Sequence, residues 1–423
     1  MQQGTGEHKY FSMKLYLTIL FSLFFSTLAD AEETVRVKPL MKAAKTAVKN
    51  NKGQEAAEKN LMDVVGRSEV TNEQRADIYF MGEELCRSLN DQENLKLYLK
   101  QPYDTIKFFS TILKMHGYLL QCDSVERSLD RKFVYRNKSR NIMLRYRNNL
   151  LNGGKFLMKK GRNTEAYPYF DMYLRVPSEP MFEYDQLLRT DTMLTKVAYW
   201  ATIAAYNAND AEKALRHMDM ALKGGDATLR PSLTEYKANC ALSLGDSALW
   251  LATLHDGVGH YPSHDYFYLH LMDYYDKVNM LDEGIALSDS LLKTVGSRGI
   301  YWYGKSSMCL RKNDFDACIA CADSTIVLDS TFVDAYYNKG IAYLNQAIEF
   351  SKTLSTSDVR SSKAKRDRAK LRGFYQFARE PMERVRALSP EDKKRWATPL
   401  YTIYLNLNLG EEFAEMEKIL NEE

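Results

Sequence analysis

The sequence predicts an all-α fold in which about eight antiparallel helix hairpins stack into a superhelical array, an α-solenoid. Only 10 prolines and 21 glycines occur among 423 residues, and 45% of the residues are hydrophobic, a balance typical of helical proteins. Aromatic and small residues recur with a period of about 34 residues through the middle of the chain. A fixed period of this length indicates a repeat protein in which each unit is one helix hairpin.

Residues 1–31 are predicted to be an N-terminal extension and a signal peptide. Lys14 precedes an apolar run from Leu15 to Leu28, and the small residues of Ala29-Asp30-Ala31 follow. This pattern is typical of a secretory signal, and the run is too short to span a bilayer comfortably. We expect cleavage after Ala31 and a periplasmic or secreted mature protein. Met13 is the more natural start, and the cleavage point has no cysteine, so a lipoprotein is not expected.

Residues 32–180 are expected to form irregular hairpins. They are predicted over Pro39–Val65 with a turn at Gly53, over Glu73–Leu99 with a turn at Asn90-Asp91, over residues 103–135, and over Arg140–Tyr173. Pro177 and Pro180 then interrupt the array. Residues 181–190 are predicted to be a connecting segment or a short extra helix.

Residues 181–350 are predicted to be the regular part of the array. Trp302 opens a helix, Asn313-Asp314 makes a turn, and Cys318 is a small residue in the second helix. A shift forward by one period places Tyr336 on Trp302 and Gly340 on Ser306, and the reverse shift places Gly284 on Cys318. Small residues at these two positions let the helices of a hairpin approach closely, while large neighbours fill the remaining volume.

This unit resembles the tetratricopeptide repeat (TPR). That family has an aromatic residue at its fourth position, a small residue at its eighth and alanine at its twentieth. Tyr336–Tyr343 is the best first-helix match, and Gly161–Ala166 and Asn209–Leu215 match the turn and the start of the second helix. Trp250, Cys318 and Gly284 stand where the family has alanine, which weakens single units.

A basic insertion is predicted at residues 351–373, inside the last regular unit. The second helix of that unit is expected to resume at Phe374. Residues 374–423 hold this helix and a closing pair over Trp396–Leu409 and Glu411–Leu420. The polar end of the closing pair suits a cap that has no further neighbour.

The resemblance implies a binding surface, because in this family the first helices line a concave groove that holds a peptide or a partner helix. The matching positions carry aromatic, polar and charged side chains. They are Tyr199, Ile203, Tyr206, Glu235, Asn239, Leu269, Asp273, Lys277, Tyr303, Ser307, Arg311, Tyr337, Ile341 and Asn345. The lysine and asparagine arrangement with which cytosolic members bind chaperone C-termini is not reproduced in register.

The sequence indicates no enzyme, no cofactor and no metal. It holds no G-x-S-x-G, Walker A or H-E-x-x-H motif. His255, His260, His264 and His270 could ligate zinc, but they run through a predicted turn, so exposed turn histidines are the favoured interpretation.

The six cysteines leave three interpretations open. A disulfide could join Cys309 to Cys318, and Cys318 with Cys321 superficially matches a redox motif. Buried thiols are favoured, because Cys318 occupies a small-residue packing position inside a helix.

Two stretches, residues 127–147 and 352–372, each hold eight lysines or arginines. Their functional interpretation is contact with an anionic partner, and the favoured alternative is a solvated helix face. The whole chain has a net charge of only +3, which disfavours nucleic-acid binding.

Asp followed by Ser or Thr recurs along the chain. The motif is similar to the O-glycan acceptor of exported Bacteroidota-type proteins, and it is also a common helix cap. The positions are Asp104, Asp123, Asp191, Asp246, Asp289, Asp323 and Asp329.

Together these features predict an envelope or periplasmic scaffold that binds a protein or peptide partner in its groove. The alternative is a glycan-binding accessory protein of an outer-membrane nutrient-uptake system, since related helical-repeat folds carry glycans on aromatic platforms. The chain has only four tryptophans and no lipoprotein cysteine, which favours the first hypothesis. No transmembrane segment is expected in the mature chain.

Overall fold

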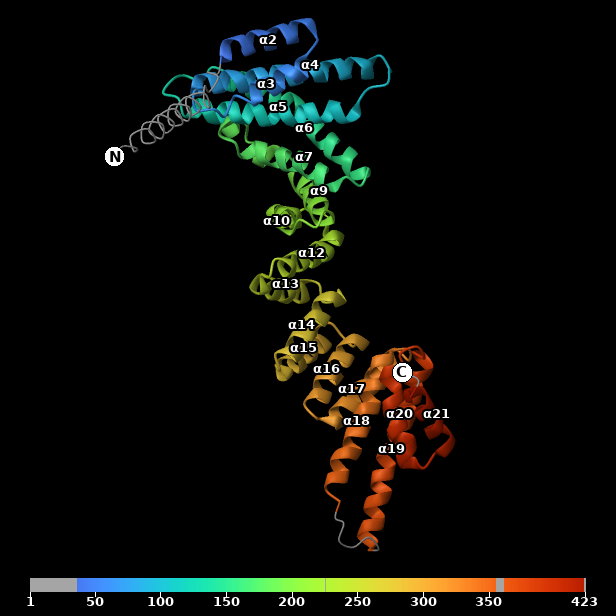
Figure 1. Ribbon diagram of the computed structural model, residues 1–423. Coiled ribbons are helices and arrows are strands. Elements are labelled where there is room, and N and C mark those ends of the chain that lie inside the picture. Colours follow the sequence, from blue (N-terminus) through green and yellow to red (C-terminus); the bar gives the residue numbers. More distant parts are fainter. Residues whose placement is uncertain (1–35, 225, 355–360, 422–423) are drawn as a thin grey trace, which may run out of the picture. The chain divides into compact units, whose positions relative to one another are not determined.

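A computed structural model of the chain describes residues 36–224, 226–354 and 361–421. These residues form helices joined by turns, with no strand among them, so the predicted all-α fold is confirmed (Figure 1). The chain divides into two compact units, and the second begins at Asp226. The predicted signal peptide and its cleavage site lie outside the described residues. Over the described ranges, no helix combines the length and the apolar character that crossing a membrane requires.

The first unit is built from successive antiparallel helix pairs. Its helices are α2 (Val37–Asn50), α3 (Gln54–Met62), α4 (Asn72–Tyr98), α5 (Thr105–Arg127), α6 (Arg136–Lys159), α7 (Asn163–Arg175), α8 (Leu187–Thr190), α9 (Leu194–Asn207), α10 (Ala211–Arg216) and α11 (Met218–Leu222). The 3-10 turns η1 (Val176–Ser178) and η2 (Pro180–Asp185) follow α7. They occupy the interruption that the prolines predict.

The predicted hairpins over Glu73–Leu99 and over residues 103–135 are both wrong, because α4 and α5 are each one continuous helix and pair with each other. The Asn90-Asp91 turn signal is overridden by packing. Asn90 is buried, and its side-chain amide donates to the carbonyl oxygen of Phe108 at 2.7 Å and to Thr111 Oγ1 at 3.2 Å. A residue with a strong turn preference therefore joins two long helices, since tertiary contacts outweigh local propensity.

A buried histidine in α5 makes the first unit sensitive to acid. His116 Nδ1 lies 2.9 Å from the carbonyl oxygen of Ile112, and Nε2 lies 3.2 Å from that of Met143. Burial lowers the pKa of His116 from 6.5 to about 4. Because the unfolded chain takes up this proton at higher pH than the folded one, stability falls as the pH drops from about 6.5 toward 4.

We expect the His116 contribution to lower the free energy of unfolding by about 2 kcal/mol between pH 7 and pH 5. Urea unfolding of the wild-type chain and of His116→Gln at both pH values measures it. The variant should show the smaller loss. Equal losses in the two proteins would mean that His116 is accessible to protons in the folded state.

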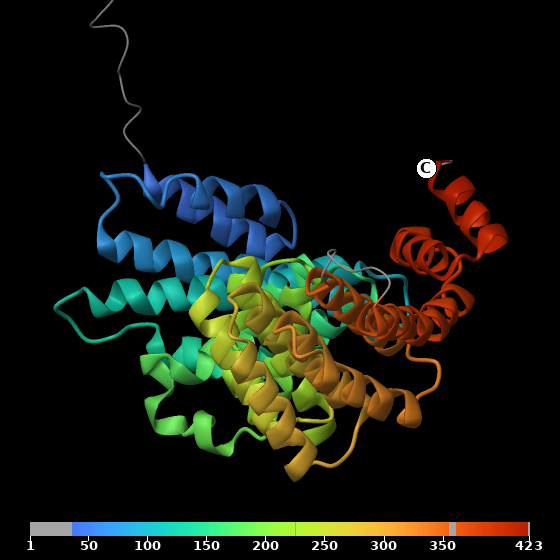
Figure 2. The same cartoon turned by 90° about the horizontal axis from the view of Figure 1, so that it is seen from below.

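The second unit contains five helix pairs in the ranges described. Its helices are α12 (Arg230–Ser243), α13 (Ser247–His260), α14 (Asp265–Lys277), α15 (Leu281–Thr294), α16 (Gly299–Arg311), α17 (Phe315–Leu328), α18 (Val333–Lys352), α19 (Ser362–Leu388), α20 (Lys393–Leu407) and α21 (Gly410–Asn421). The 3-10 turn η3 (Ala227–Leu229) precedes α12. In each pair the second helix runs back along the first (Figure 2).

The turns inside the hairpins follow one design. One residue adopts a left-handed conformation, which only glycine and asparagine reach at low cost. These residues are Gly161, Asn209, Gly245, Asn279 and Asn313. In the α12–α13 turn the next residue, Asp246, closes the first helix through its N–H to the carbonyl oxygen of Ala241 at 2.9 Å. Its side chain accepts from Leu249 N–H at 2.9 Å and caps the second helix.

The small residues lie at the helix crossings that the period predicts. Ser306 Oγ lies 3.5 Å from Cys318 Sγ across the α16–α17 hairpin, and both residues are buried. A Cβ atom on Gly340 would overlap the side chain of Met382 in α19. The register from Trp302 to Tyr336 is therefore confirmed at the level of individual contacts.

The hairpin formed by α18 and α19 is longer than the sequence predicts. α19 begins at Ser362 and not at Phe374, so most of the predicted basic insertion extends two helices that already pair. Phe350 and Phe374 pack edge to face with centroids 5.8 Å apart, and Lys370 lies over the Phe350 ring. These contacts explain why the helical pairing continues past the regular repeat length.

Candidate functional site

The first helices of the second unit form a contiguous row. Contacts join α14 to α16, α16 to α18 and α18 to α20, in addition to the contacts within each hairpin. Asp273 and Lys277 of α14 are exposed, as is Arg311 of α16. We call the surface of this row the first-helix face. It consists of Asp273, Lys277, Tyr303, Ser307, Arg311, Tyr337, Ile341 and Asn345.

Tyr303 lies at the centre of this face. Its ring packs against Phe332 with centroids 5.0 Å apart. Burial first, and the negative charge of Asp334 second, raise the pKa of the Tyr303 hydroxyl, while Ser307 lies within hydrogen-bonding reach of it. Asn338 Nδ2 donates to Ser307 Oγ at 3.0 Å and ties α18 to α16. The centre of the face is thus a fixed polar and aromatic surface.

Two members of this site were missed by the sequence prediction. Arg395 in α20 pairs with Asp334 in α18, and its guanidinium carbon lies 4.4 Å from the centroid of the Tyr337 ring. Asp334 precedes Tyr337 by three positions on the same helical stripe, so helical spacing could have found it. Arg395 follows the α19 extension, where the repeat period no longer gives the register.

The remaining predicted residues of the second unit lie on the same row or at its start. Arg311 Nε lies 2.5 Å from Asp276 Oδ1 and links α16 to α14. Asn239 Oδ1 accepts from the Tyr266 hydroxyl at 2.7 Å, which links α12 to α14. Ile341 and Asn345 are half-buried in α18.

Three predicted residues lie in the first unit. Tyr199, Ile203 and Tyr206 are half-buried on α9, which packs against α7, α10 and α11. They share one stripe of that helix. A single groove that joins them to the first-helix face stays a prediction.

The recurring turns, the small residues at the helix crossings and the row of first helices agree with the helix-hairpin fold that the resemblance of the sequence to the tetratricopeptide repeat implies.

No protein-family model and no curated protein matches the chain. Among solved structures, the C-terminal part of a TPR protein from Cytophaga hutchinsonii is similar over 62% of this chain and 97% of that one, with 12% identity and a TM-score of 0.35. A TPR protein from Bacteroides fragilis is similar over 60% and 96%, with 15% identity and a TM-score of 0.30. The TPR domain of P58(IPK) is similar over 88% and 98%, with 12% identity and a TM-score of 0.30.

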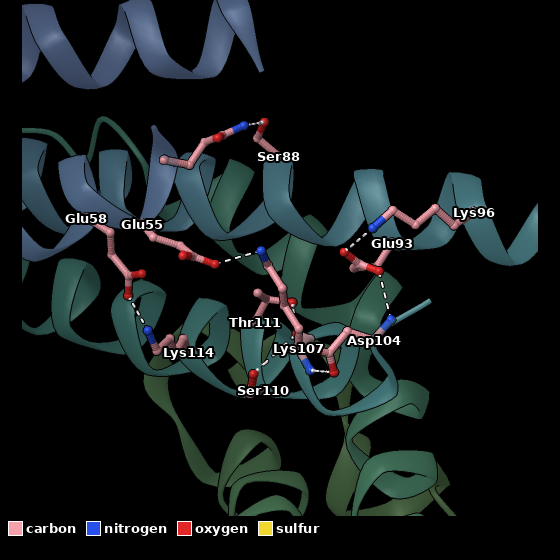
Figure 3. A network of polar contacts seen from close by, with 11 residues as sticks. Glu55, Glu58, Ser88, Glu93, Lys96, Asp104, Lys107, Ser110, Thr111 and Lys114 are labelled. Carbon is pink, nitrogen blue, oxygen red and sulfur yellow. Dashed lines mark hydrogen bonds and ion pairs between the residues drawn. The ribbon is translucent and has the colours of Figure 1, made fainter. Parts of the chain in front are cut away.

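The N-terminal hairpins hold a polar pocket that the sequence prediction missed. A cavity of about 470 Å³ lies between α3, α4 and α5. Figure 3 shows its charged walls, in which Glu55 meets Lys107 at 2.6 Å and Glu58 meets Lys114 at 2.7 Å. Glu58 is buried and also accepts from the Tyr118 hydroxyl at 2.6 Å. The glutamates come from α3 and the lysines from α5, so they bind the two helices together.

The chemistry of this pocket indicates a structural role. Burial and the Glu58 carboxylate raise the pKa of Tyr118 well above its ordinary value, and burial raises that of the Cys86 thiol. Both groups therefore favour their protonated forms near neutral pH. The carboxylates of Glu55 and Glu58 are already paired with lysines. The pocket stabilises the N-terminal hairpins.

The histidines weighed as metal ligands spread along two helices. His255 and His260 are exposed on α13. His264 Nε2 lies 2.7 Å from Glu235 Oε2, and His270 Nδ1 lies 2.8 Å from the carbonyl oxygen of Tyr266. Over the ranges that the structure describes, no group of three potential ligands converges on one point.

The six cysteines are buried free thiols. Cys318 Sγ faces Ser306 Oγ and the carbonyl oxygen of Asn338, at 3.5 and 3.7 Å. Cys309 instead hydrogen-bonds to Cys321, which raises the pKa of Cys309 and lowers that of Cys321. Cys309 and Cys318 belong to one hydrophobic cluster and are free thiols in this structure, which favours the buried-thiol interpretation.

The Asp-Ser/Thr positions serve the fold where the structure shows their contacts. Asp104 and Asp246 cap helices, accepting from Lys107 N–H and Leu249 N–H at 2.9 Å. Asp289 pairs with Lys305 at 2.6 Å and Asp323 with Lys339 at 2.7 Å. The helix-cap explanation therefore holds for the first two, and modification of the neighbouring hydroxyls stays a prediction.

Half of the cations in the basic stretch 127–147 pair with carboxylates of the fold. Arg127 and Arg136 pair with the buried Asp123 at 3.2 and 2.7 Å. Arg140 pairs with Asp185, and Arg147 pairs with Asp191. Arg136, Arg140 and Arg147 thus fasten α6 to α5 and to the irregular segment after α7, whereas Arg127 pairs within α5. The paired arginines of residues 127–147 stabilise the fold. Residues 352–372 are therefore the better candidate for contact with an anionic partner.

Proposed function

We propose that this chain is an exported TPR scaffold that binds a protein or peptide partner on the first-helix face. The observation that carries the proposal is the row of α14, α16, α18 and α20, because it brings tyrosines and charges of both signs onto one surface. Tyrosine gives contact area with little loss of side-chain entropy, and fixed charges select and orient a partner.

The composition of the face favours a protein over a glycan. None of the four tryptophans belongs to it. Trp396 is buried, Trp250 packs edge to face on Tyr274, Trp302 donates to Ser297 Oγ, and Trp200 carries the Lys155 ammonium over its ring. The charged residues Asp273, Lys277 and Arg311 suit the mixed charges of a peptide better than a neutral sugar.

Export rests on the signal pattern of residues 1–31. Mass spectrometry of the protein recovered from cell fractions tests it. We expect a mature chain that starts at Glu32 and lies in the periplasmic or secreted fraction. An intact N-terminus in the cytoplasmic fraction would contradict this part of the proposal.

A charge-swap experiment tests the binding face. Asp273→Lys with Lys277→Glu inverts two exposed charges on α14 and leaves the net charge unchanged. Its matched control, Glu283→Lys with Lys293→Glu, does the same on the exposed surface of the second helix α15. Pull-downs from envelope extract are quantified by mass spectrometry.

We expect partner recovery to fall about tenfold with the α14 swap and to stay unchanged with the α15 swap, since two exposed charges together contribute on the order of 1.4 kcal/mol. Equal recovery with both swaps would contradict the proposal. A thermal shift with neutral glycans, combined with no recovered protein, would favour the glycan alternative.

A further inference from the structure

The first half of α19 presents an unusual concentration of positive charge. Between residues 363 and 372 the helix carries six lysines or arginines and one acidic residue, Asp367. Within the described ranges, Lys363, Lys365 and Arg366 have no carboxylate partner. The basic stretch 127–147 behaves differently, because four of its six arginines pair with aspartates of the fold.

This charge opposes the intrinsic electrostatics of the helix. The N-terminus of a helix carries a partial positive charge and favours acidic residues, yet the first turn of α19 holds none. Ser361 caps the helix through its hydroxyl, which accepts from Ala364 N–H at 3.1 Å. Lys363, Lys365 and Arg366 therefore destabilise the end of α19 slightly.

The cations form two rows. At 3.6 residues per turn, Lys363, Arg366 and Lys370 follow one flank of α19, and Lys365, Arg368 and Arg372 follow the opposite flank. The side toward the hairpin is marked by the half-buried Leu371 and the buried Tyr375 and Ala378. The rows thus border the outward side of the helix.

The outward side between the rows carries small or uncharged residues. These residues are Ser362, Ala369, Gly373 and Gln376, of which Ser362, Ala369 and Gln376 are exposed. A Cβ atom on Gly373 would meet no atom within 4 Å. A partner can therefore approach the α19 backbone closely and reach both cationic rows at once.

We propose that this outward face of α19 docks an acidic helix of a protein partner. Charge complementarity identifies the sign of the partner, and the small residues identify its shape, because two helices with small side chains between them pack closely. Acidic residues on both flanks of the partner helix then meet the two basic rows, in the manner of the flanking charges of a coiled coil.

The same features disfavour a lipid surface. A helix that lies on a membrane buries large apolar side chains between its cations. The outward side of α19 has alanine, glycine, serine and glutamine in those places. Anionic lipid would be attracted to the positive charges, but this side of α19 has no large apolar side chain that could insert into the bilayer.

This site is separate from the first-helix face, because it lies on the second helix of its hairpin. Failure of one proposal leaves the other standing. The two can be tested with different probes.

The probe is a dye-labelled, alanine-based peptide with glutamates on both flanks of an alanine stripe, made about six turns long so that it is helical in water. Its matched control has glutamine in place of every glutamate. Binding to the mature chain is measured by fluorescence anisotropy at two salt concentrations. Vesicles of phosphatidylglycerol and phosphatidylcholine are the lipid probe.

The test variant is Lys363→Gln, Arg366→Gln and Lys370→Gln, and all three side chains are exposed. The control variant, Lys38→Gln, Lys42→Gln and Lys45→Gln, removes the same charge from the exposed side of α2. Circular dichroism confirms that both variants remain helical.

We expect the glutamate peptide to bind and the glutamine peptide not to bind, with affinity that falls as salt rises. The α19 variant should weaken binding about tenfold, because three exposed ion pairs contribute on the order of 0.5 kcal/mol each. The α2 variant should change it less than about twofold. The proposal would be overturned if both variants weakened binding equally or if the glutamate peptide did not bind. Binding of anionic vesicles in place of the peptide would also overturn it.

Discussion

Replacing Asp191 by alanine is expected to lower the free energy of unfolding of the first unit by about 3–5 kcal/mol. Arg147 Nη1 lies 2.5 Å from Asp191 Oδ2, and both side chains are about nine-tenths buried. The Tyr173 hydroxyl donates to the same carboxylate at 2.9 Å, and the Tyr173 ring lies 3.8 Å from the guanidinium carbon. Without Asp191 the buried guanidinium keeps its charge and loses its only carboxylate partner in the described fold.

The measurement is urea unfolding of the wild-type chain, Asp191→Ala, Arg147→Met and the double variant Arg147→Met with Asp191→Ala. Both single variants should lose stability. The double variant should regain most of the loss, because no buried charge then remains unpaired. Additive losses in the double variant would show that the ion pair is not the source of the effect.

Leucine in place of Gly257 is expected to lower the free energy of unfolding of the second unit by about 3 kcal/mol, at the upper end of the range for overpacking. A Cβ atom at this position would already overlap the ring of Phe267. That ring is fully buried and belongs to the hydrophobic cluster that joins α13 and α14.

Gly259 is the matched control, because it lies two positions further along α13 and no atom would meet its Cβ within 4 Å. Gly259→Leu should leave the melting temperature unchanged or raise it slightly, since leucine is a better helix former than glycine. Thermal unfolding of the two variants gives the comparison. A similar change in both would mean that α13 and α14 are further apart than the structure shows.

The regular hairpins could be predicted from the sequence because their signals are local and repeated. Asn313 adopts the left-handed conformation and Asp314 caps the next helix, and the same pair of roles falls to Gly245 and Asp246. A turn of this kind needs particular residue types, so its position is visible in the sequence alone.

The α2–α3 and α6–α7 hairpins follow their turn glycines, Gly53 and Gly161, but the α4–α5 hairpin could not be predicted in this way. Asn90 has the composition of a turn residue, and only the presence of Phe108 and Thr111 on a neighbouring helix explains why it stays helical. Those partners lie 18 and 21 residues away in sequence. No local pattern reports such a contact.

The ion pairs of the basic stretches also depend on partners that are distant in the sequence. Arg140 and Arg147 stand in a run that is basic by composition, but their aspartate partners come from the segment after α7. For this reason only part of the candidate site could be predicted from the sequence. The repeat period predicted the positions of Tyr303 and Tyr337. Arg395 contacts Tyr337 from α20, and the repeat period no longer predicts positions after the long α19 helix.

Photo-crosslinking tests the central claim most directly. A benzophenone amino acid replaces Lys277 on the first helix α14 in one version of the chain. In the other it replaces Val327, which is 85% exposed on the second helix α17. Both proteins are irradiated in the cells that produce them. A binding face on the first helices predicts a defined protein adduct at position 277 and none at position 327, and the reverse pattern would contradict it.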